Sequence, residues 1–278
     1  MIKHETEFYG SRFQVFEYRS INDYLTDAET MKDVSTNGHS TWNKTWSGSA
    51  SYDAALEMAR FGWDEVAKEM TAQLKVALKN QQIDTQVKSI LDVCGFQCNV
   101  PMYLAGAPNN MIRQQRVTHK SKVINLIKPM GATANVSRDQ YVKAGVECMK
   151  IINALEKRGY AVNLYVASAS KYDSSQGYSS FMVKIKNANE RLNVSKLAFF
   201  LASPSVHRRF NFALMKKYGF YGVGGTQDPY VARGMMKAVE EAGIVKNAYV
   251  LDSSLGQGFT GKSAEDMVDS LVEHFEKK

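Results

Sequence analysis

The second half of the chain alternates short apolar runs with segments of helical periodicity. The apolar runs predict strands at residues 123–127, 161–167, 181–186, 197–201 and 248–251. Apolar side chains spaced three and four residues apart predict helices at residues 137–158, 205–217, 230–242 and 263–276. Nearly continuous apolar strands separated by helices are typical of a sheet that is covered on both faces. We therefore expect an α/β fold with a three-layer, mostly parallel sheet of the Rossmann type.

The first part of the chain has a less regular pattern. Residues 52–80 carry apolar side chains at helical spacing, but Gly62 and Trp63 interrupt it, so one helix and two helices both fit. Residues 35–51 are dense in Ser, Thr, Asn and Gly, which is typical of a loop. After a short apolar run at residues 87–93, glycines and prolines follow one another closely, and we expect irregular structure there.

The distribution of charge supports a division of the chain after Val117. The 35 basic and 28 acidic residues give a net charge of +7, yet residues 1–117 carry −2 and residues 118–278 carry +9. We expect a mainly helical and irregular N-terminal region at residues 1–117 and an α/β domain at residues 118–278. A basic balance is compatible with an anionic partner such as nucleic acid, but it does not name a function.

Other features of composition exclude several classes of protein. No run of 18 apolar residues predicts a membrane span, and acidic residues near the N-terminus argue against a secretion signal. Three cysteines are too few for a disulfide framework, which favours a reducing compartment. Cys94 and Cys98 lack the spacing of a zinc site, the five histidines are scattered, and no G-x-S-x-G motif is present. We expect no metal, no cofactor and no catalytic residues.

A glycine-rich stretch matches the phosphate-binding P-loop pattern G-x-x-x-x-G-K-[ST]. The matching positions are Gly256, Gly261, Lys262 and Ser263. Only 15 residues follow the motif, so no downstream strand remains to supply the acidic residue that a P-loop NTPase uses for Mg²⁺. A structural loop with a capping box, a static anion site and a nucleotide site all remain open.

Two basic groups suggest contacts with phosphate or nucleic acid. Their residues are Lys120, Lys122, Arg208, Arg209, Lys216 and Lys217. Guanidinium and ammonium groups bind phosphates, and neighbouring aromatic side chains can stack on unpaired bases. The alternative is that the aromatic residues of segment 205–217 face the core, while its cations are solvated or pair with carboxylates inside the protein.

The opening of the second half resembles a von Willebrand factor A (vWA) domain. The resemblance rests on the strand at residues 123–127, the long helix after it and the following pair of strands. In that family the first strand ends in a D-x-S-x-S loop that binds a divalent cation. Here Lys128, Met130 and Ala132 stand at the three ligand positions, so the resemblance implies a degenerate site without metal. The corresponding candidate binding loop comprises Lys128, Met130, Gly131, Ala132 and Thr133.

The chain is also similar to a family of uncharacterised tailed-bacteriophage proteins with a degenerate vWA-like second half. The similarity rests on three motifs: Gly62-Trp63, Gly95-x5-Pro101-x-Tyr103-Leu-x-Gly106-x-Pro108-x-x-Met111 and Arg208-Arg209-x-x-Phe212. This resemblance implies a viral origin and brings no established activity.

From these patterns we expect a non-catalytic, phage-encoded, vWA-like protein that mediates protein–protein interaction or assembly. It would act as a virion component or as an accessory factor in the host cytoplasm, with other protein subunits or further copies of itself as partners and without a membrane. The alternatives are a nucleic-acid-binding protein that uses the basic second half, and a nucleotide-binding protein that uses residues 256–263.

Overall fold

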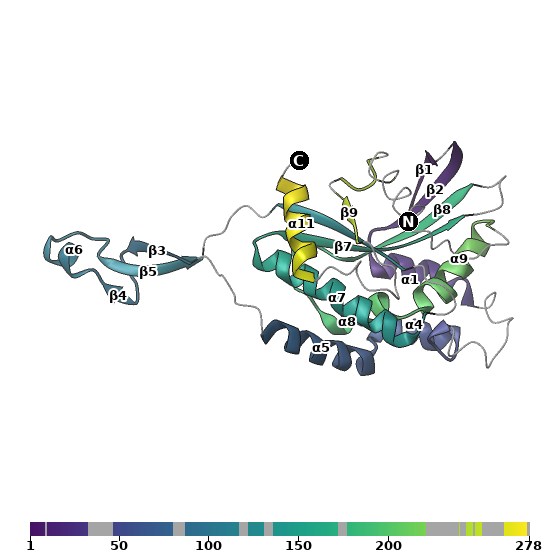
Figure 1. Cartoon of the computed structure of the whole chain (residues 1–278), viewed down its shortest axis with the longest axis horizontal. Coiled ribbons are helices and arrows are strands. Elements are labelled where there is room, and N and C mark those ends of the chain that lie inside the picture. The colour runs from purple at the N-terminus through teal and green to yellow at the C-terminus, as the bar shows by residue number, and fades with distance from the viewer. Residues whose placement is uncertain are drawn as a thin grey trace.

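A computed structural model of the chain describes most of its residues (Figure 1). The described ranges are 1–8, 10–32, 47–79, 87–116, 122–130, 136–171, 177–220, 239, 243–246, 248–251 and 264–276. The strands are β1 (Ile2–Phe8), β2 (Ser11–Tyr18), β3 (Val87–Asp92), β4 (Gln97–Cys98), β5 (Met111–Arg116), β6 (Val123–Pro129), β7 (Ala161–Lys171), β8 (Tyr178–Lys186) and β9 (Ala248–Val250). The helices are α1 (Ile21–Glu29), α4 (Tyr52–Phe61), α5 (Asp64–Lys79), α6 (Val100–Leu104), α7 (Arg138–Lys157), α8 (Val194–Ala202), the π-helix η1 (Val206–Asn211), α9 (Phe212–Lys217) and α11 (Ala264–Glu276).

The main sheet is mixed and curled, with the strand order β1-β2-β8-β7-β6-β9. Strand β2 runs parallel to β8, and β6 runs parallel to β7 and β9. The β1–β2 and β7–β8 pairs are antiparallel. The prediction of a mostly parallel, three-layer sheet of vWA or Rossmann type is therefore wrong. Short connections explain the difference, because strands joined without a crossover helix pair in opposite directions.

Several predicted elements are confirmed in place. They are the strands β6, β7, β8 and β9 and the helices α7 and α11. The helical pattern of residues 52–80 forms two helices, α4 and α5, with Gly62 between them at a φ of 102°. The predicted helix at residues 230–242 and most of the expected loop at 35–51 lie outside the described residues.

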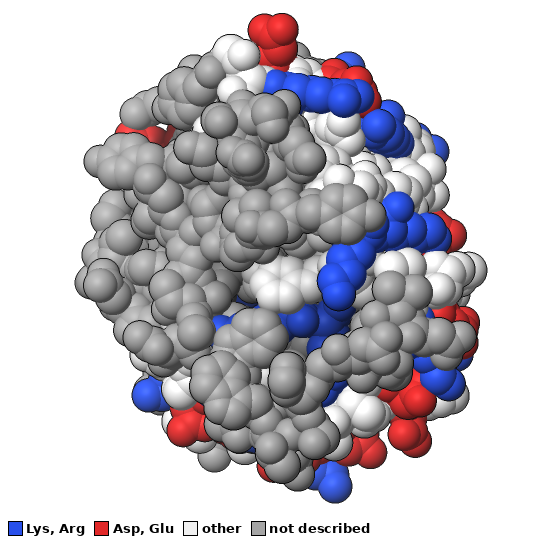
Figure 2. Space-filling view, turned by 90° about the vertical axis from the view of Figure 1, so that its right-hand side faces the viewer, with Lys and Arg blue, Asp and Glu red and all other residues white. Residues whose placement is uncertain are grey.

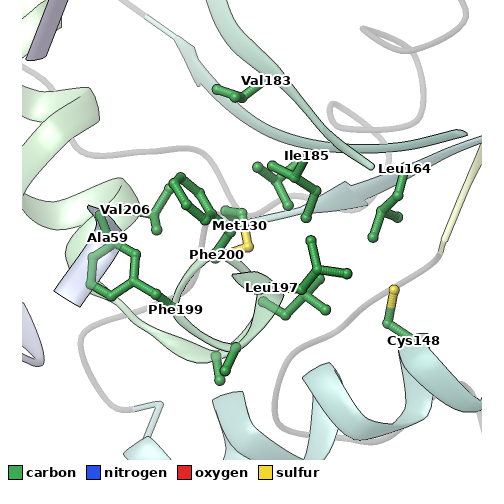
Figure 3. Packing of buried hydrophobic residues seen from close by; sticks show 14 of the residues in the cluster. Ala59, Met130, Cys148, Leu164, Val183, Ile185, Leu197, Phe199, Phe200 and Val206 are labelled. Atoms are coloured by element: carbon green, nitrogen blue, oxygen red, sulfur yellow. The ribbon is translucent and has the colours of Figure 1, made fainter. Parts of the chain in front are cut away.

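The predicted strand at residues 197–201 is wrong, because this apolar run lies in helix α8. Asn193 caps the helix, and its Oδ1 atom accepts a hydrogen bond from the backbone N–H of Lys196 at 3.1 Å. A short, fully apolar run fits a buried strand and a buried helix equally well, so periodicity alone cannot separate them. Figure 3 shows Leu197 of α8 between Ile185 and Leu164 of the sheet and Cys148 of α7, whereas Phe199 lies beside Ala59 of α4.

Segments from both sides of residue 117 contribute to the main body. β2 pairs with β8, and α4 and α5 pack against α8. One large hydrophobic core contains residues of the sheet and of helices α1, α4, α5, α7, α8, α9 and α11. A second, smaller cluster on the sheet includes Phe13, Val15, Ile127 and Met182.

A buried polar network joins the N-terminal helix to the second half of the chain. The Tyr24 hydroxyl donates to Asn211 Oδ1 at 2.7 Å, and Asn211 Nδ2 donates to the Ser168 hydroxyl at 2.7 Å. All three residues are buried. One asparagine therefore satisfies polar groups from α1 and β7 inside the core.

Replacing this asparagine is expected to destabilise the protein strongly. Asn211→Ala leaves the buried Ser168 hydroxyl without this donor and leaves the Tyr24 hydroxyl only the Val206 carbonyl as an acceptor at 3.2 Å, which lowers the free energy of unfolding by about 1–3 kcal/mol. Urea denaturation followed by circular dichroism measures the change. The control is Asn109→Ala at an exposed position, and equal stabilities of the two variants would contradict the role of the network.

Candidate functional site

Residues 87–116, which we call the arm, form a small unit that stands apart from the main body in Figure 1. The arm contains a three-stranded sheet of order β3-β5-β4 and the short helix α6. Six of the ten exposed large apolar side chains in the described chain belong to it. They are Leu91, Val93, Phe96, Val100, Tyr103 and Leu104, with exposures from 42% to 78%. The arm thus carries most of the large apolar side chains that the described chain leaves exposed.

The arm is ordered by its backbone. β3 pairs with β5 over its whole length in antiparallel register. Gly95 lies so close to β5 that an added Cβ atom would come within 2.2 Å of the Ile112 carbonyl oxygen. Asn99 caps α6 through a hydrogen bond from the backbone N–H of Met102 at 3.3 Å, and Arg113 pairs with Asp92 at 2.8 Å. These contacts fix the shape of the arm and leave its apolar side chains outside.

The arm has no hydrophobic core of its own. None of residues 89–114 is buried. A three-stranded sheet normally gains its stability by burying one face, and contiguous exposed apolar surface in proteins marks interaction sites. The geometry therefore fits a surface that is covered by another molecule.

Two of the three cysteines also lie in the arm. Cys94 and Cys98 are exposed, whereas Cys148 is buried in α7. Burial raises the pKa of the Cys148 thiol to about 12, so it stays protonated at neutral pH. Thiol reagents should consequently modify the arm selectively in the folded protein.

The predicted binding loop begins inside the protein. Lys128 and Met130 are each only 1% exposed, and the Lys128 ammonium donates to Met130 Sδ at 3.4 Å. Burial lowers the pKa of Lys128 to about 8. Gly131, Ala132 and Thr133 lie outside the described residues. The two described members of the loop are thus core residues, and their side chains are not displayed to a partner.

The segment around Arg208 and Arg209 is helical, as predicted, and it begins as the π-helix η1. Arg208 is only 5% exposed, with its guanidinium 5.8 Å from the centre of the Tyr141 ring. Arg209 donates to the hydroxyl and the carbonyl oxygen of Ser49 at 2.5 and 2.6 Å. Both arginines therefore serve the packing of the main body, which favours the structural alternative over contacts with phosphate.

The structure describes only three of the remaining predicted site residues, Lys122, Lys216 and Lys217. Lys122 and Lys216 are exposed, whereas Lys217 pairs with Asp27 and donates to the hydroxyl of Thr30 at 2.8 Å. Lys120 and the P-loop-like residues Gly256, Gly261, Lys262 and Ser263 lie outside the described residues. Figure 2 shows Lys and Arg side chains in a broken band across one face of the molecule.

Lys128 gives a stability prediction with a defined pH dependence. Its pKa of about 8 in the folded state lies below its ordinary value of 10.5, so the folded state binds fewer protons than the unfolded state between these values. Stability should rise from about pH 8 to pH 10.5, and at pH 7 the buried charge costs about 3 kcal/mol. Lys128→Met should raise the free energy of unfolding at pH 7. In this variant, the increase in stability between pH 8 and pH 10.5 that Lys128 causes should be absent.

Urea denaturation of the wild type and of Lys128→Met at pH 7, 8, 9 and 10 tests this expectation. The exposed position Lys143 provides the matched control, Lys143→Met. A variant that is less stable than the wild type at pH 7, with an unchanged pH profile, would show that Lys128 is not a buried charge.

No helix in the described ranges is long and apolar enough to cross a membrane. A search of curated proteins finds no match, and neither does a search of solved structures. A family model described as a domain of unknown function, DUF7192, matches residues 5–277. The match confirms membership of an uncharacterised family, and it carries no link to bacteriophages or to vWA domains. The chain belongs to the DUF7192 family.

Proposed function

We propose that this protein is a non-catalytic binding protein that contacts another protein subunit through its arm. The observation that carries the proposal is the arm's apolar surface: six large side chains are exposed on a unit in which none of residues 89–114 is buried. Apolar side chains of this kind form the centre of protein interfaces, where a few of them supply most of the binding energy.

Charge complementarity points to an acidic partner. The arm contains three basic residues, Lys88, Arg113 and Arg116, and one acidic residue, Asp92, and the whole chain has a net charge of +7. Two copies of the chain would repel one another at long range, whereas an acidic protein would be attracted. The occupant is therefore an acidic protein with an apolar groove that receives the side chains around Phe96 and Leu104.

The biological setting of the proposal is the one that the sequence motifs imply by their resemblance to tailed-bacteriophage proteins. In that setting the protein is a virion component or an accessory factor in the host cytoplasm, and the arm attaches it to a different subunit. The nucleic-acid alternative has less support, because Arg208 is buried and Arg209 is bound to Ser49. His207 adds no charge there at neutral pH, since burial lowers its pKa to about 4.

Selective labelling of the arm tests the proposal. The folded chain, labelled at Cys94 and Cys98 with a photoactivatable maleimide, is irradiated in an extract of its native source, and the cross-linked protein is identified and purified. We expect an acidic partner whose Kd rises at least roughly tenfold with Phe96→Ser plus Leu104→Ser, because each residue would fill an apolar pocket. Titration of the purified pair measures the change.

Controls separate the arm from general effects of surface substitution. Val76→Ser, at a position 67% exposed on α5, should leave the Kd unchanged, and added salt should weaken the complex. Cross-linking to a second copy of the chain would overturn the proposal that the partner is an acidic protein. An unchanged Kd of the arm variant, or the absence of any cross-linked protein, would overturn the docking role of the arm.

A further inference from the structure

A separate cavity of about 580 Å³ lies in the main body, at the carboxyl ends of β2 and β8. The two strands are parallel neighbours, so their ends reach the same edge of the sheet. Arg19 follows β2, and Lys184 to Asn187 end β8, while the first residues of α1 and α8 form the adjoining wall. Crevices at the carboxyl ends of parallel strands are common ligand sites in α/β proteins.

The charged side chains of the cavity are mainly cationic. Four basic residues line it, Arg19, Arg60, Lys184 and Lys196, with a single carboxylate, Glu190. Glu190 accepts hydrogen bonds from the backbone N–H and side-chain amide of Asn187 at 3.2 and 3.0 Å, and it also pairs with Lys196 at 3.8 Å. Arg60 pairs with Glu29, which does not line the cavity, at 2.5 Å. With Glu29 counted, the four cations and two carboxylates leave a formal charge of +2, which favours an anion. The cations left for an anion are Arg19 and Lys184, and the Lys184 ammonium lies 5.7 Å from the centre of the Tyr165 ring.

Two helices direct their N-terminal ends toward the same cavity. Ser20 caps α1 through the backbone N–H of Asp23, and Asn193 caps α8 through that of Lys196. In a helix, the amide groups before these capped positions have no partner within the helix. Ile21, Asn22 and Ser195 belong to these first turns and line the cavity. The positive ends of two helix dipoles therefore add to the field of the four cations.

An exposed aromatic residue stands at the rim. Phe61, the last residue of α4, lines the cavity and is 83% exposed, the largest exposure among the large apolar side chains of the described chain. Gly62, at a φ of 102°, brings the end of α4 against α8, since an added Cβ atom would lie 3.3 Å from the Ser195 carbonyl oxygen. This close approach places the end of α4, and with it Phe61, beside the first turn of α8.

We propose that this cavity binds a nucleoside phosphate. The phosphates lie against Arg19, Lys184 and the first turns of α1 and α8, and the base stacks on Phe61. The volume falls within the range of small-molecule sites, which is about 300–1,000 Å³. A phosphate group matches cations and helix N-termini, whereas a base matches an open aromatic face. None of the residues that line this site belongs to the arm.

Isothermal titration calorimetry of the full chain with ADP, ATP, pyrophosphate and adenosine tests the proposal. We expect ADP and ATP to bind, pyrophosphate to bind more weakly, and adenosine to give no measurable binding. The double variant Arg19→Gln plus Lys184→Gln should raise the Kd of ADP and of pyrophosphate by at least roughly tenfold, because both cations line the cavity and would bind the phosphates. Phe61→Ser should raise the Kd of ADP roughly tenfold and leave the Kd of pyrophosphate unchanged, because only ADP has a base that can stack on Phe61.

Control variants make the assignment specific to this cavity. Lys143→Gln removes an exposed charge on α7, and Lys262→Ala removes the lysine of the P-loop-like motif; both should bind ADP as the wild type does. Loss of ADP binding in Lys262→Ala alone would assign the nucleotide to residues 256–263. Equal binding of ADP by wild type and Phe61→Ser would exclude base recognition here, and no binding at millimolar nucleotide would overturn the site altogether.

Discussion

The burial of helix α8 is the constraint on which the rest of the main body depends. Residues 197–202 are all buried, and a helix that is apolar on every side is stable only when other elements cover every side. α4, α5, α7 and β8 supply this cover, although they come from both halves of the chain. Because each large side chain contributes about 2 kcal/mol on burial, α8 binds the two halves into one core.

The position of α8 also determines what surrounds its two ends. Its N-terminus lies beside that of α1 at the edge of the sheet, where the cationic cavity opens. Its C-terminus leads into η1, which carries Asn211 to the hydroxyls of Tyr24 and Ser168. The N-terminal end therefore lies at the cavity, where Asn193 caps it, whereas the C-terminal end is bonded into the core. The same packing that stabilises the fold brings together side chains as distant in sequence as Arg19 and Lys196.

Local patterns in the sequence predicted those elements whose stability is mainly local. Ser137 and Gln140 form the capping box of α7, and β6 and β7 appear where apolar runs predicted strands. The strands β1 and β2 were not predicted, because their mixed aromatic pattern does not by itself indicate a strand. β2 is stabilised by pairing with β8, which is distant in sequence. α8 was predicted as a strand for the same reason, since tertiary packing decides between the two structures in a short apolar run. The cavity could not be predicted at all, because no motif links the ends of β2, β8, α1 and α8.

The basic residues of the chain lie in two different environments, which the sequence alone does not distinguish. Lys128 and Arg208 are buried, so their charges lower the stability of the fold and add little to the charge of the outer surface. Two cations of the cavity, Arg60 and Lys196, are 41% and 51% exposed and pair with the carboxylates of Glu29 and Glu190. The arm differs from both, since its exposed side chains are mainly apolar and its charge is small. An excess of basic residues thus says little about a partner until each cation is placed, whereas exposed apolar side chains on a unit without buried residues support the proposal of a partner directly.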